Sequence, residues 1–246
     1  MSRILIFGGT AEARELAGLL VRRGYDVTTS LAGVTNEPRL PEHGAVVRGG
    51  FGGAAGIAAY IAREHIAAIV DATHPFAARI SQHAYSASID CGIPYFRIER
   101  PPWIAEPGDQ WTEVSNIAAA VAAVPDGAKV MLTVGRKEAA AFLARPGLTG
   151  IVRMIEEPVC AIPDVWTLIR ERPPFSVEHE AALIEKHGLN VLATKNSGGG
   201  QTYSKLLAAR AKCLPVVMIA RPLKPQAPSF TTAAGLAAAM DNLLNS

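Results

Sequence analysis

Short apolar runs alternate with helix-forming runs along the whole of this 246-residue chain. In the first half the pattern predicts strands at 4–7, 27–30, 46–47, 69–71 and 95–98 and helices at 11–23, 54–64 and 76–91. In the second half it predicts strands at 130–134, 151–154, 166–169, 191–194 and 216–219 and helices at 116–124, 137–143, 177–187, 203–211 and 232–244. This alternation is typical of parallel sheets with crossover helices. We therefore predict an α/β protein.

Prolines interrupt this pattern near the middle of the chain. Pro101-Pro102-Trp103 and Pro107-Gly108-Asp109 disfavour regular structure. The sequence predicts two domains, 1–103 and 104–246, with the same alternating plan in both.

The composition excludes several classes of protein. A formal net charge of +2 is too small to suggest nucleic-acid binding. Apolar stretches such as 117–124 are far shorter than the roughly 20 residues that a membrane-spanning helix needs, and the first residues carry no export signal. We expect a cytoplasmic protein with no membrane or nucleic-acid partner. No metal site is expected, because the histidines lack ligand spacing and the three cysteines are scattered, namely Cys91, Cys160 and Cys213.

The motif Asp71-Ala72-Thr73-His74-Pro75-Phe76-Ala77 follows a predicted strand, and Pro75 can open the next helix. Its polar residues then lie at the carboxyl edge of a sheet, where open α/β folds bind ligands. His74 is a ligand contact, a proton donor, or a side chain whose hydrogen bond holds the turn at 73–75.

The motif Phe7-Gly8-Gly9-Thr10-Ala11-Glu12-Ala13 joins the first strand to the first helix. Glycines there let the backbone approach a phosphate, and the helix start binds anions. The order differs from G-x-G-x-x-G, so a tight turn with Thr10 as N-cap is the alternative. The next strand ends in Thr28-Thr29-Ser30-Leu31-Ala32-Gly33, without a carboxylate, which favours NADP over NAD if a dinucleotide binds.

Two other glycine-rich loops are candidate ligand contacts. Arg48-Gly49-Gly50-Phe51-Gly52-Gly53 precedes a helix, and ligand contact explains it better than a flexible connector. The run from Lys195 to Lys205 contains Asn196, Ser197, Gly198 and Gly199 but lacks Walker A spacing, so we reject a kinase or ATPase. Basic residues near predicted strand ends are either ligand contacts or solvated charges: Arg97, Arg100, Arg136, Lys137, Arg153, Arg221 and Lys224.

Together these motifs resemble the precorrin-6A reductase family, the NADPH-dependent reductases of corrin (vitamin B12) biosynthesis. The resemblance covers essentially the whole chain. It also includes Glu99-Arg100-Pro101-Pro102-Trp103 and Thr194-Lys195-Asn196-Ser197-Gly198-Gly199.

The resemblance implies two Rossmann-like domains, with parallel sheets flanked by helices and an active-site cleft between them. It implies hydride transfer from NADPH to a ring double bond of precorrin-6A, a polycarboxylate tetrapyrrole, to give precorrin-6B. The residues assigned to the cofactor are Gly8, Gly9, Thr10, Ser30, Gly33, Gly50, Phe51, Thr73 and His74. Residues expected to face the cleft, and to contact cofactor or substrate, are Lys195, Asn196, Ser197, Gly198 and Gly199. His74, Lys195 and Tyr203 are candidate catalytic proton donors.

Several alternatives stay open at this point. The substrate could be cobalt-precorrin-6A of the anaerobic route, or the chain could be a non-catalytic NADP-sensing protein. A sugar-nucleotide epimerase or short-chain reductase is disfavoured, because Tyr85 and Tyr203 are followed four residues later by Ile89 and Leu207 instead of lysine. Transient contacts with neighbouring pathway enzymes are also expected.

Overall fold

Two compact units make up the protein, in a computed structural model that describes residues 1–31 and 39–244. Unit 1 comprises Met1–Pro101 and Leu223–Ser246, and unit 2 comprises Pro102–Pro222. Each unit is built on one six-stranded sheet. The predicted α/β class is confirmed.

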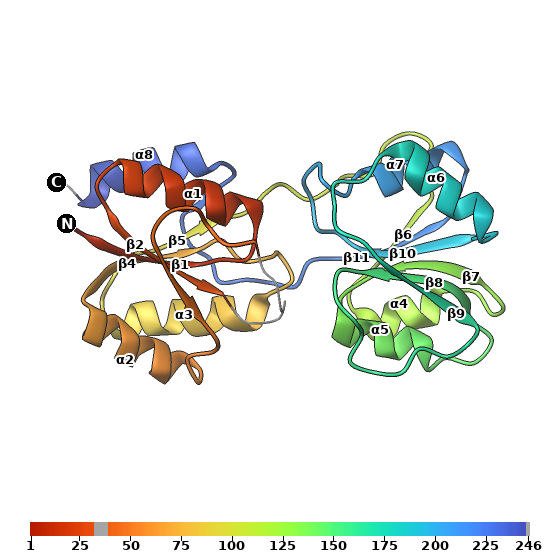
Figure 1. Ribbon diagram of the computed structural model, residues 1–246, viewed down its shortest axis with the longest axis horizontal. Coiled ribbons are helices and arrows are strands. Elements are labelled where there is room, and N and C mark those ends of the chain that lie inside the picture. Colours follow the sequence, from red (N-terminus) through yellow and green to blue (C-terminus); the bar gives the residue numbers. More distant parts are fainter. Residues whose placement is uncertain (32–38, 245–246) are drawn as a thin grey trace. The chain divides into compact units, whose positions relative to one another are not determined.

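Unit 1 has the strand order β12-β5-β4-β1-β2-β3, and every pair is parallel. Helices α1 and α8 cover one face of the sheet and α2 and α3 cover the other (Figure 1). The strands are β1 (Arg3–Phe7), β2 (Asp26–Leu31), β3 (Ala45–Arg48), β4 (Ile66–Asp71), β5 (Tyr95–Ile98) and β12 (Ser229–Phe230). The helices are α1 (Ala11–Arg22), α2 (Ala54–Glu64), α3 (Ala78–Asp90) and α8 (Ala233–Leu244).

Both faces of this sheet are buried. Side chains alternate along a strand, so Ile4 and Ile6 of β1 join the core beneath α1 and α8. Leu5 and Phe7 join the core beneath α2 and α3. This double burial explains why the first strand has an unbroken apolar sequence rather than an alternating one.

Unit 2 has the strand order β6-β11-β10-β7-β8-β9, again with only parallel pairs. Helices α6 and α7 lie on one face and α4 and α5 on the other (Figure 1). The strands are β6 (Trp111–Val114), β7 (Lys129–Thr133), β8 (Thr149–Met154), β9 (Trp166–Arg170), β10 (Val191–Lys195) and β11 (Val216–Ile219). The helices are α4 (Ile117–Ala123), α5 (Arg136–Leu143), α6 (Val177–Lys186) and α7 (Ser204–Ala211).

Five strands of each sheet share one topology, with the order β5-β4-β1-β2-β3 in unit 1 and β11-β10-β7-β8-β9 in unit 2. The remaining edge strand comes last in sequence in unit 1 (β12) and first in unit 2 (β6). In unit 1 the first strand, β1, lies between β2 and β4, and in unit 2 β7 lies between β8 and β10. The direction of winding therefore reverses beside β1 and beside β7. The loops that follow β1 and β4, and those that follow β7 and β10, flank these switch points, where open α/β sheets bind ligands.

The end of the chain returns to unit 1, whereas the sequence pattern predicts that residues 104–246 form a second domain. Strand β12 pairs with β5, where Ser229 is opposite Arg97 and Phe230 is opposite Ile98. Helix α8 then packs on α1 through Leu236 and Met240. These contacts join segments more than a hundred residues apart, which local sequence patterns do not reveal.

Smaller differences from the predicted elements occur at β6, at β12 and at the start of α3. Strands β6 and β12 were not predicted, because both are short and partly polar. Helix α3 begins at Ala78 instead of residue 76, because Pro75 lies in a turn in which the Ala77 N–H donates to the His74 carbonyl.

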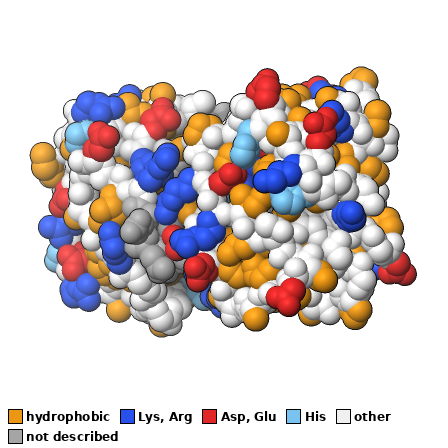
Figure 2. Space-filling view, turned by 45° about the vertical axis from the view of Figure 1, so that its right-hand side comes forward, with side chains coloured by type: hydrophobic (Ala, Val, Ile, Leu, Met, Phe, Trp, Pro, Cys, Tyr) orange, Lys and Arg blue, Asp and Glu red, His pale blue; other side chains and the backbone are white. Residues whose placement is uncertain are grey.

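Charge of both signs is mixed on the surface. Figure 2 shows Lys and Arg side chains interspersed with Asp and Glu side chains over the face in view. Within residues 1–31 and 39–244, no helix is both long enough and apolar enough to cross a membrane. No cluster of His, Cys, Asp and Glu suited to a metal ion occurs in the same residues.

The returning segment predicts a pair of stability effects in one helix. Leu236 of α8 is fully buried, whereas Leu243 of the same helix is 58% exposed. We expect Leu236→Ala to lower the free energy of unfolding by about 2–5 kcal/mol through cavity formation. The matched variant Leu243→Ala should change it by less than about 0.5 kcal/mol. Urea unfolding measures both, and equal effects would contradict the packing of α8 on unit 1.

Candidate functional site

The loop after β1 is held in place by Thr10. Its hydroxyl accepts the Ala13 N–H at 3.1 Å, which caps α1, and donates to the Ala72 carbonyl at 2.7 Å. The N-cap role considered for Thr10 is therefore present, and the same side chain joins the loop after β1 to the loop after β4. The two sides of the switch point form one hydrogen-bonded edge.

Gly8 and Gly9 have different roles in this loop. A Cβ at Gly8 would lie 2.7 Å from Thr29 Cγ2, so the backbone can approach β2 only because the residue is glycine. Gly9 is exposed, has φ of +110°, and has nothing within 4 Å of the position of a Cβ. No described residue therefore fills the space in front of Gly9 at the start of α1.

The loop after β4 is organised by the buried carboxylate of Asp71. The backbone N–H and the hydroxyl of Thr73 donate to Oδ1 at 3.0 and 2.6 Å, and Tyr95 Oη donates to Oδ2 at 2.9 Å. Lys224 Nζ lies 3.6 Å from Oδ2 and donates to Thr73 Oγ1 at 3.2 Å. The side chains of Asp71 and Lys224 are 0% and 4% exposed, so this is a buried ion pair.

Electrostatics within this cluster favour the ionised carboxylate. Burial alone would raise the pKa of Asp71, but the charge of Lys224 and hydrogen bonds from Ser81 and Thr73 outweigh it and lower that pKa. Burial and the neighbouring Asp71 raise the pKa of Tyr95, which therefore stays protonated and donates. Burial lowers the pKa of Lys224, and the charges of Asp71 and Glu99 oppose this shift.

Sequence reasoning noted Lys224 only as one basic residue near a strand end and did not single out Tyr95. One signal was present: Lys224 is the only lysine in unit 1. Its partners are far away in the sequence, since Thr73 is 151 residues earlier. No local pattern indicates such a pair.

His74 holds the turn that follows Asp71. Its Nδ1 accepts the Phe76 N–H at 3.3 Å, and its ring lies 5.9 Å from the Phe76 ring, centroid to centroid. The turn-holding alternative considered for His74 is therefore present in the structure.

The loop after β3 brings its glycines to the same edge of unit 1. The Phe51 ring, expected to contact cofactor, packs edge-on against Phe7 and Tyr60 at 5.8 and 5.0 Å. Gly50 is exposed, and a Cβ there would meet nothing within 4 Å. Ser30 is buried near the end of β2, where its carbonyl accepts the Gly8 N–H. Gly33 lies outside the described residues.

In unit 2 the strand-end cation Lys195 is paired with a carboxylate. Its Nζ donates to Glu138 Oε1 at 2.6 Å. Burial would raise the pKa of Glu138, but the hydrogen bond and charge of Lys195 outweigh it and lower that pKa. Glu138 lies in the first turn of α5, and a Cβ on Gly135 would lie 2.3 Å from its Oε2. This carboxylate therefore folds back over the start of α5.

Asn196 and its neighbours hold the segment around Trp103. Asn196 is buried, its Oδ1 accepts the Trp103 N–H at 2.8 Å, and its Nδ2 donates to the Trp103 carbonyl at 2.9 Å. The Gly199 carbonyl accepts Trp103 Nε1–H at 2.9 Å. We expect Asn196 to face a cleft. In the structure both polar atoms of its side chain are hydrogen-bonded to the Trp103 backbone. Arg221 donates to the Ser197 carbonyl, and buried Gly198 has φ of +67°.

Tyr203 lies just before α7 in a network of charged side chains. Its hydroxyl donates to Glu106 Oε1 at 3.2 Å and accepts from Arg210 Nη2 at 3.2 Å. Arg210 also binds Asp109, and this guanidinium outweighs burial to lower the pKa of Asp109. The Tyr203 hydroxyl is therefore hydrogen-bonded to two side chains of unit 2.

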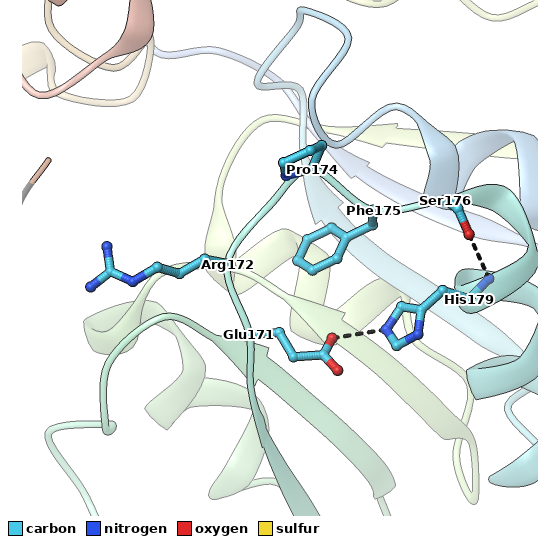
Figure 3. Close-up of a pocket in the computed structure, with 6 residues that line it drawn as sticks. All are labelled: Glu171, Arg172, Pro174, Phe175, Ser176 and His179. Carbon is cyan, nitrogen blue, oxygen red and sulfur yellow. Dashed lines mark hydrogen bonds and ion pairs between the residues drawn. The ribbon is translucent and has the colours of Figure 1, made fainter.

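A cavity of about 380 Å³ opens beyond the end of β9. Figure 3 shows Glu171 and His179 pointing toward each other beside Phe175, while Arg172 extends away from them; His179 Nε2 is 2.9 Å from Glu171 Oε2. Beneath the Phe175 ring, Arg153 makes a buried bidentate pair with Glu180, with both N–O distances 2.8 Å. The rim carries charges of both signs, and its His–Glu pair was not predicted.

Comparison with known proteins identifies the family. The model described as "Precorrin-6x reductase CbiJ/CobK" matches residues 3–241. The precorrin-6A reductase of Rhodococcus erythropolis is 47% identical over 229 residues, 92% of each chain. The chain belongs to the precorrin-6A reductase family.

Other comparisons agree with this assignment. A precorrin-6A reductase of Mycobacterium tuberculosis is 43% identical, covering 92% of this chain and 91% of that one. A cobalt-precorrin-6A reductase of Priestia megaterium is 33% identical, covering 89% and 90%. The solved structure "CobK precorrin-6A reductase" superposes with a TM-score of 0.91 at 36% identity, covering 98% of this chain and 97% of that one. The family predicted from the motifs is confirmed.

In this member of the precorrin-6A reductase family, the motif residues form two groups. One group lies at the carboxyl edge of the first sheet and comprises Gly8, Gly9, Thr10, Ser30, Gly50, Thr73 and His74. The other group lies at the carboxyl edge of the second sheet and comprises Lys195, Asn196, Ser197, Gly198, Gly199 and Tyr203.

The buried ion pair in unit 1 predicts a large stability effect. Lys224→Met would leave the Asp71 carboxylate buried without a cation, so we expect the free energy of unfolding to fall by about 3–5 kcal/mol. Lys212→Met is the matched control, because Lys212 pairs with Glu185 at 39% and 64% exposure. It should change stability by less than about 1 kcal/mol. Urea unfolding at neutral pH compares them, and similar effects would show that the Lys224 pair contributes little.

Proposed function

We propose that this protein reduces a ring double bond of precorrin-6A to precorrin-6B in cobalamin biosynthesis, with NADPH as reductant. The observation that carries the proposal is the 47% identity to a precorrin-6A reductase over 92% of both chains. The match to the structure of another such enzyme, with a TM-score of 0.91, supports the same reaction.

Precorrin-6A is favoured over its cobalt complex by the pattern of identities. The compared relatives named precorrin-6A reductase are 39% to 47% identical to this chain. Those named cobalt-precorrin-6A reductase are 25% to 33% identical. We therefore propose the metal-free substrate, with the cobalt complex as the alternative.

The residues at the edge of unit 1 fit a dinucleotide. Gly9 leaves open space before the N-terminus of α1, whose first N–H groups have no partner within the helix and can bind a diphosphate. The exposed backbone at Gly50 and Gly52 has no atom of the described residues within 4 Å of a Cβ position, so a ligand can lie against it. Ser30 and Leu31, at the end of β2, carry no carboxylate to repel a 2′-phosphate.

We assign two roles to the protein groups: some position the cofactor, and one donates a proton to the substrate. When bound, NADPH would supply the hydride. The loop around Thr73 and His74, fixed by Asp71, would orient the ring that donates it. Lys195 is the first candidate to hold the proton, because it lies at the carboxyl end of β10 beside the switch point of its sheet. His74 and Tyr203 are the other candidates.

We further propose a cytoplasmic location and transient contacts with neighbouring enzymes of the pathway. The substrate side chains carry several carboxylates, which suit the Arg and Lys side chains near the strand ends.

The reaction is tested by mixing the protein anaerobically with NADPH and precorrin-6A and following the absorption of both. Coupled loss of NADPH and a change in the tetrapyrrole spectrum is the expected result. Turnover only with the cobalt complex would replace the substrate. Binding of NADPH without turnover of either compound would support the NADP-sensing alternative.

Gly9 predicts a specific effect on cofactor affinity. We expect Gly9→Leu to weaken NADPH binding about tenfold or more, because the side chain would enter the open space before α1. Gly24→Leu is the matched control: its φ is +85°, nothing lies within 4 Å of its Cβ position, and it follows the opposite end of α1. Both variants have the same kind of backbone strain. Fluorescence titration measures affinity, and equal values for both variants would remove Gly9 from the site.

A further inference from the structure

We propose that Arg48 binds the 2′-phosphate of NADPH and thereby makes unit 1 prefer NADPH to NADH. The inference rests on the proposed function, because it names a residue that selects the proposed cofactor. It concerns a side chain that the motifs did not assign to any role.

The first observation is the position of Arg48 in the sheet. In dinucleotide-binding folds the adenosine ribose lies beyond the end of the second strand, which here is β2. Strand β3 runs parallel to β2, and Arg48, its last residue, is opposite Leu31, the last residue of β2. The Gly49 N–H donates to the Leu31 carbonyl at 3.0 Å, which joins the two strand ends. Arg48 is therefore one strand spacing, about 5 Å, from the end of β2.

The second observation is that the Arg48 guanidinium is not committed to the protein. It is exposed, and within residues 1–31 and 39–244 it has no ion pair or hydrogen bond. Other arginines of unit 1 have carboxylate partners: Arg3 with Asp26, Arg23 with Asp241, Arg97 with Glu99 and Arg100 with Glu12. Among the described residues, therefore, no carboxylate competes with an anion for the donors of Arg48.

The third observation is the bare backbone beside Arg48. Four glycines follow it, and among residues 1–31 and 39–244 no atom lies within 4 Å of a Cβ position on any of them: Gly49, Gly50, Gly52 and Gly53. On the β3 side, a ligand at the end of β2 would therefore meet glycine backbone and the Arg48 guanidinium. A planar guanidinium binds a phosphate dianion through two parallel hydrogen bonds, which a ribose hydroxyl cannot match.

An exposed arginine could instead serve only solubility. That role predicts equal effects of its removal on NADPH and NADH. The proposed role predicts a loss confined to ligands that carry the 2′-phosphate.

The test measures equilibrium binding of NADPH and NADH, and of 2′,5′-ADP and 5′-AMP, which lack nicotinamide. For Arg48→Gln we expect affinity for NADPH and 2′,5′-ADP to fall about tenfold to a hundredfold, with NADH and 5′-AMP nearly unchanged. Arg48→Lys should recover part of the loss, because it restores the charge but not the bidentate geometry. Arg22→Gln, an exposed arginine in the last turn of α1, is the control for net charge and should leave the preference intact.

The outcomes separate this inference from the function on which it rests. A wild-type preference for NADPH that persists in Arg48→Gln overturns the role of Arg48 and leaves the cofactor in place. Wild-type protein that binds NADH as tightly as NADPH overturns both. Raising the salt concentration gives a second readout: screening should reduce the wild-type preference and leave that of Arg48→Gln almost unchanged.

Discussion

The carboxylate of Asp71 is the group on which the candidate site of unit 1 depends. A buried charge is tolerated only when it is paired and hydrogen-bonded. Thr73, Tyr95 and Lys224 meet that requirement from three different segments, and each is thereby fixed in place. The need to pair the buried Asp71 carboxylate at the end of β4 thus fixes the conformation of the following loop and attaches the returning end of the chain through Lys224.

The two units share the topology of five strands but differ at the starts of their switch-point helices. In unit 1, Gly9 leaves the start of α1 open. In unit 2, the Glu138 carboxylate folds over the start of α5 and is paired with Lys195. An anion already occupies the place where a diphosphate would be attracted. This contrast is the physical reason for proposing the dinucleotide on unit 1.

Several residues of the sequence motifs make contacts that build the fold around the site. Asn196 and Gly199 hold Trp103, Tyr203 binds Glu106 and Arg210, and Phe51 packs on Phe7. Strand-end loops of an α/β sheet must satisfy their own polar backbone before they can present groups to a ligand. A polar residue in such a loop is therefore weak evidence for ligand contact until its partners are known.

The sequence by itself determined the α/β class, most of the helices and strands, the family and the strand-end loops, because these follow from local periodicity and short ordered motifs. The Thr10 cap was also readable, since its partner is three residues away. Only the tertiary structure decided that Leu223–Ser246 joins unit 1, that Lys224 pairs with Asp71, and that the Asn196 side chain is buried. These features depend on groups that are far apart in the chain and meet only when the sheets form, so nothing in the local sequence indicates them.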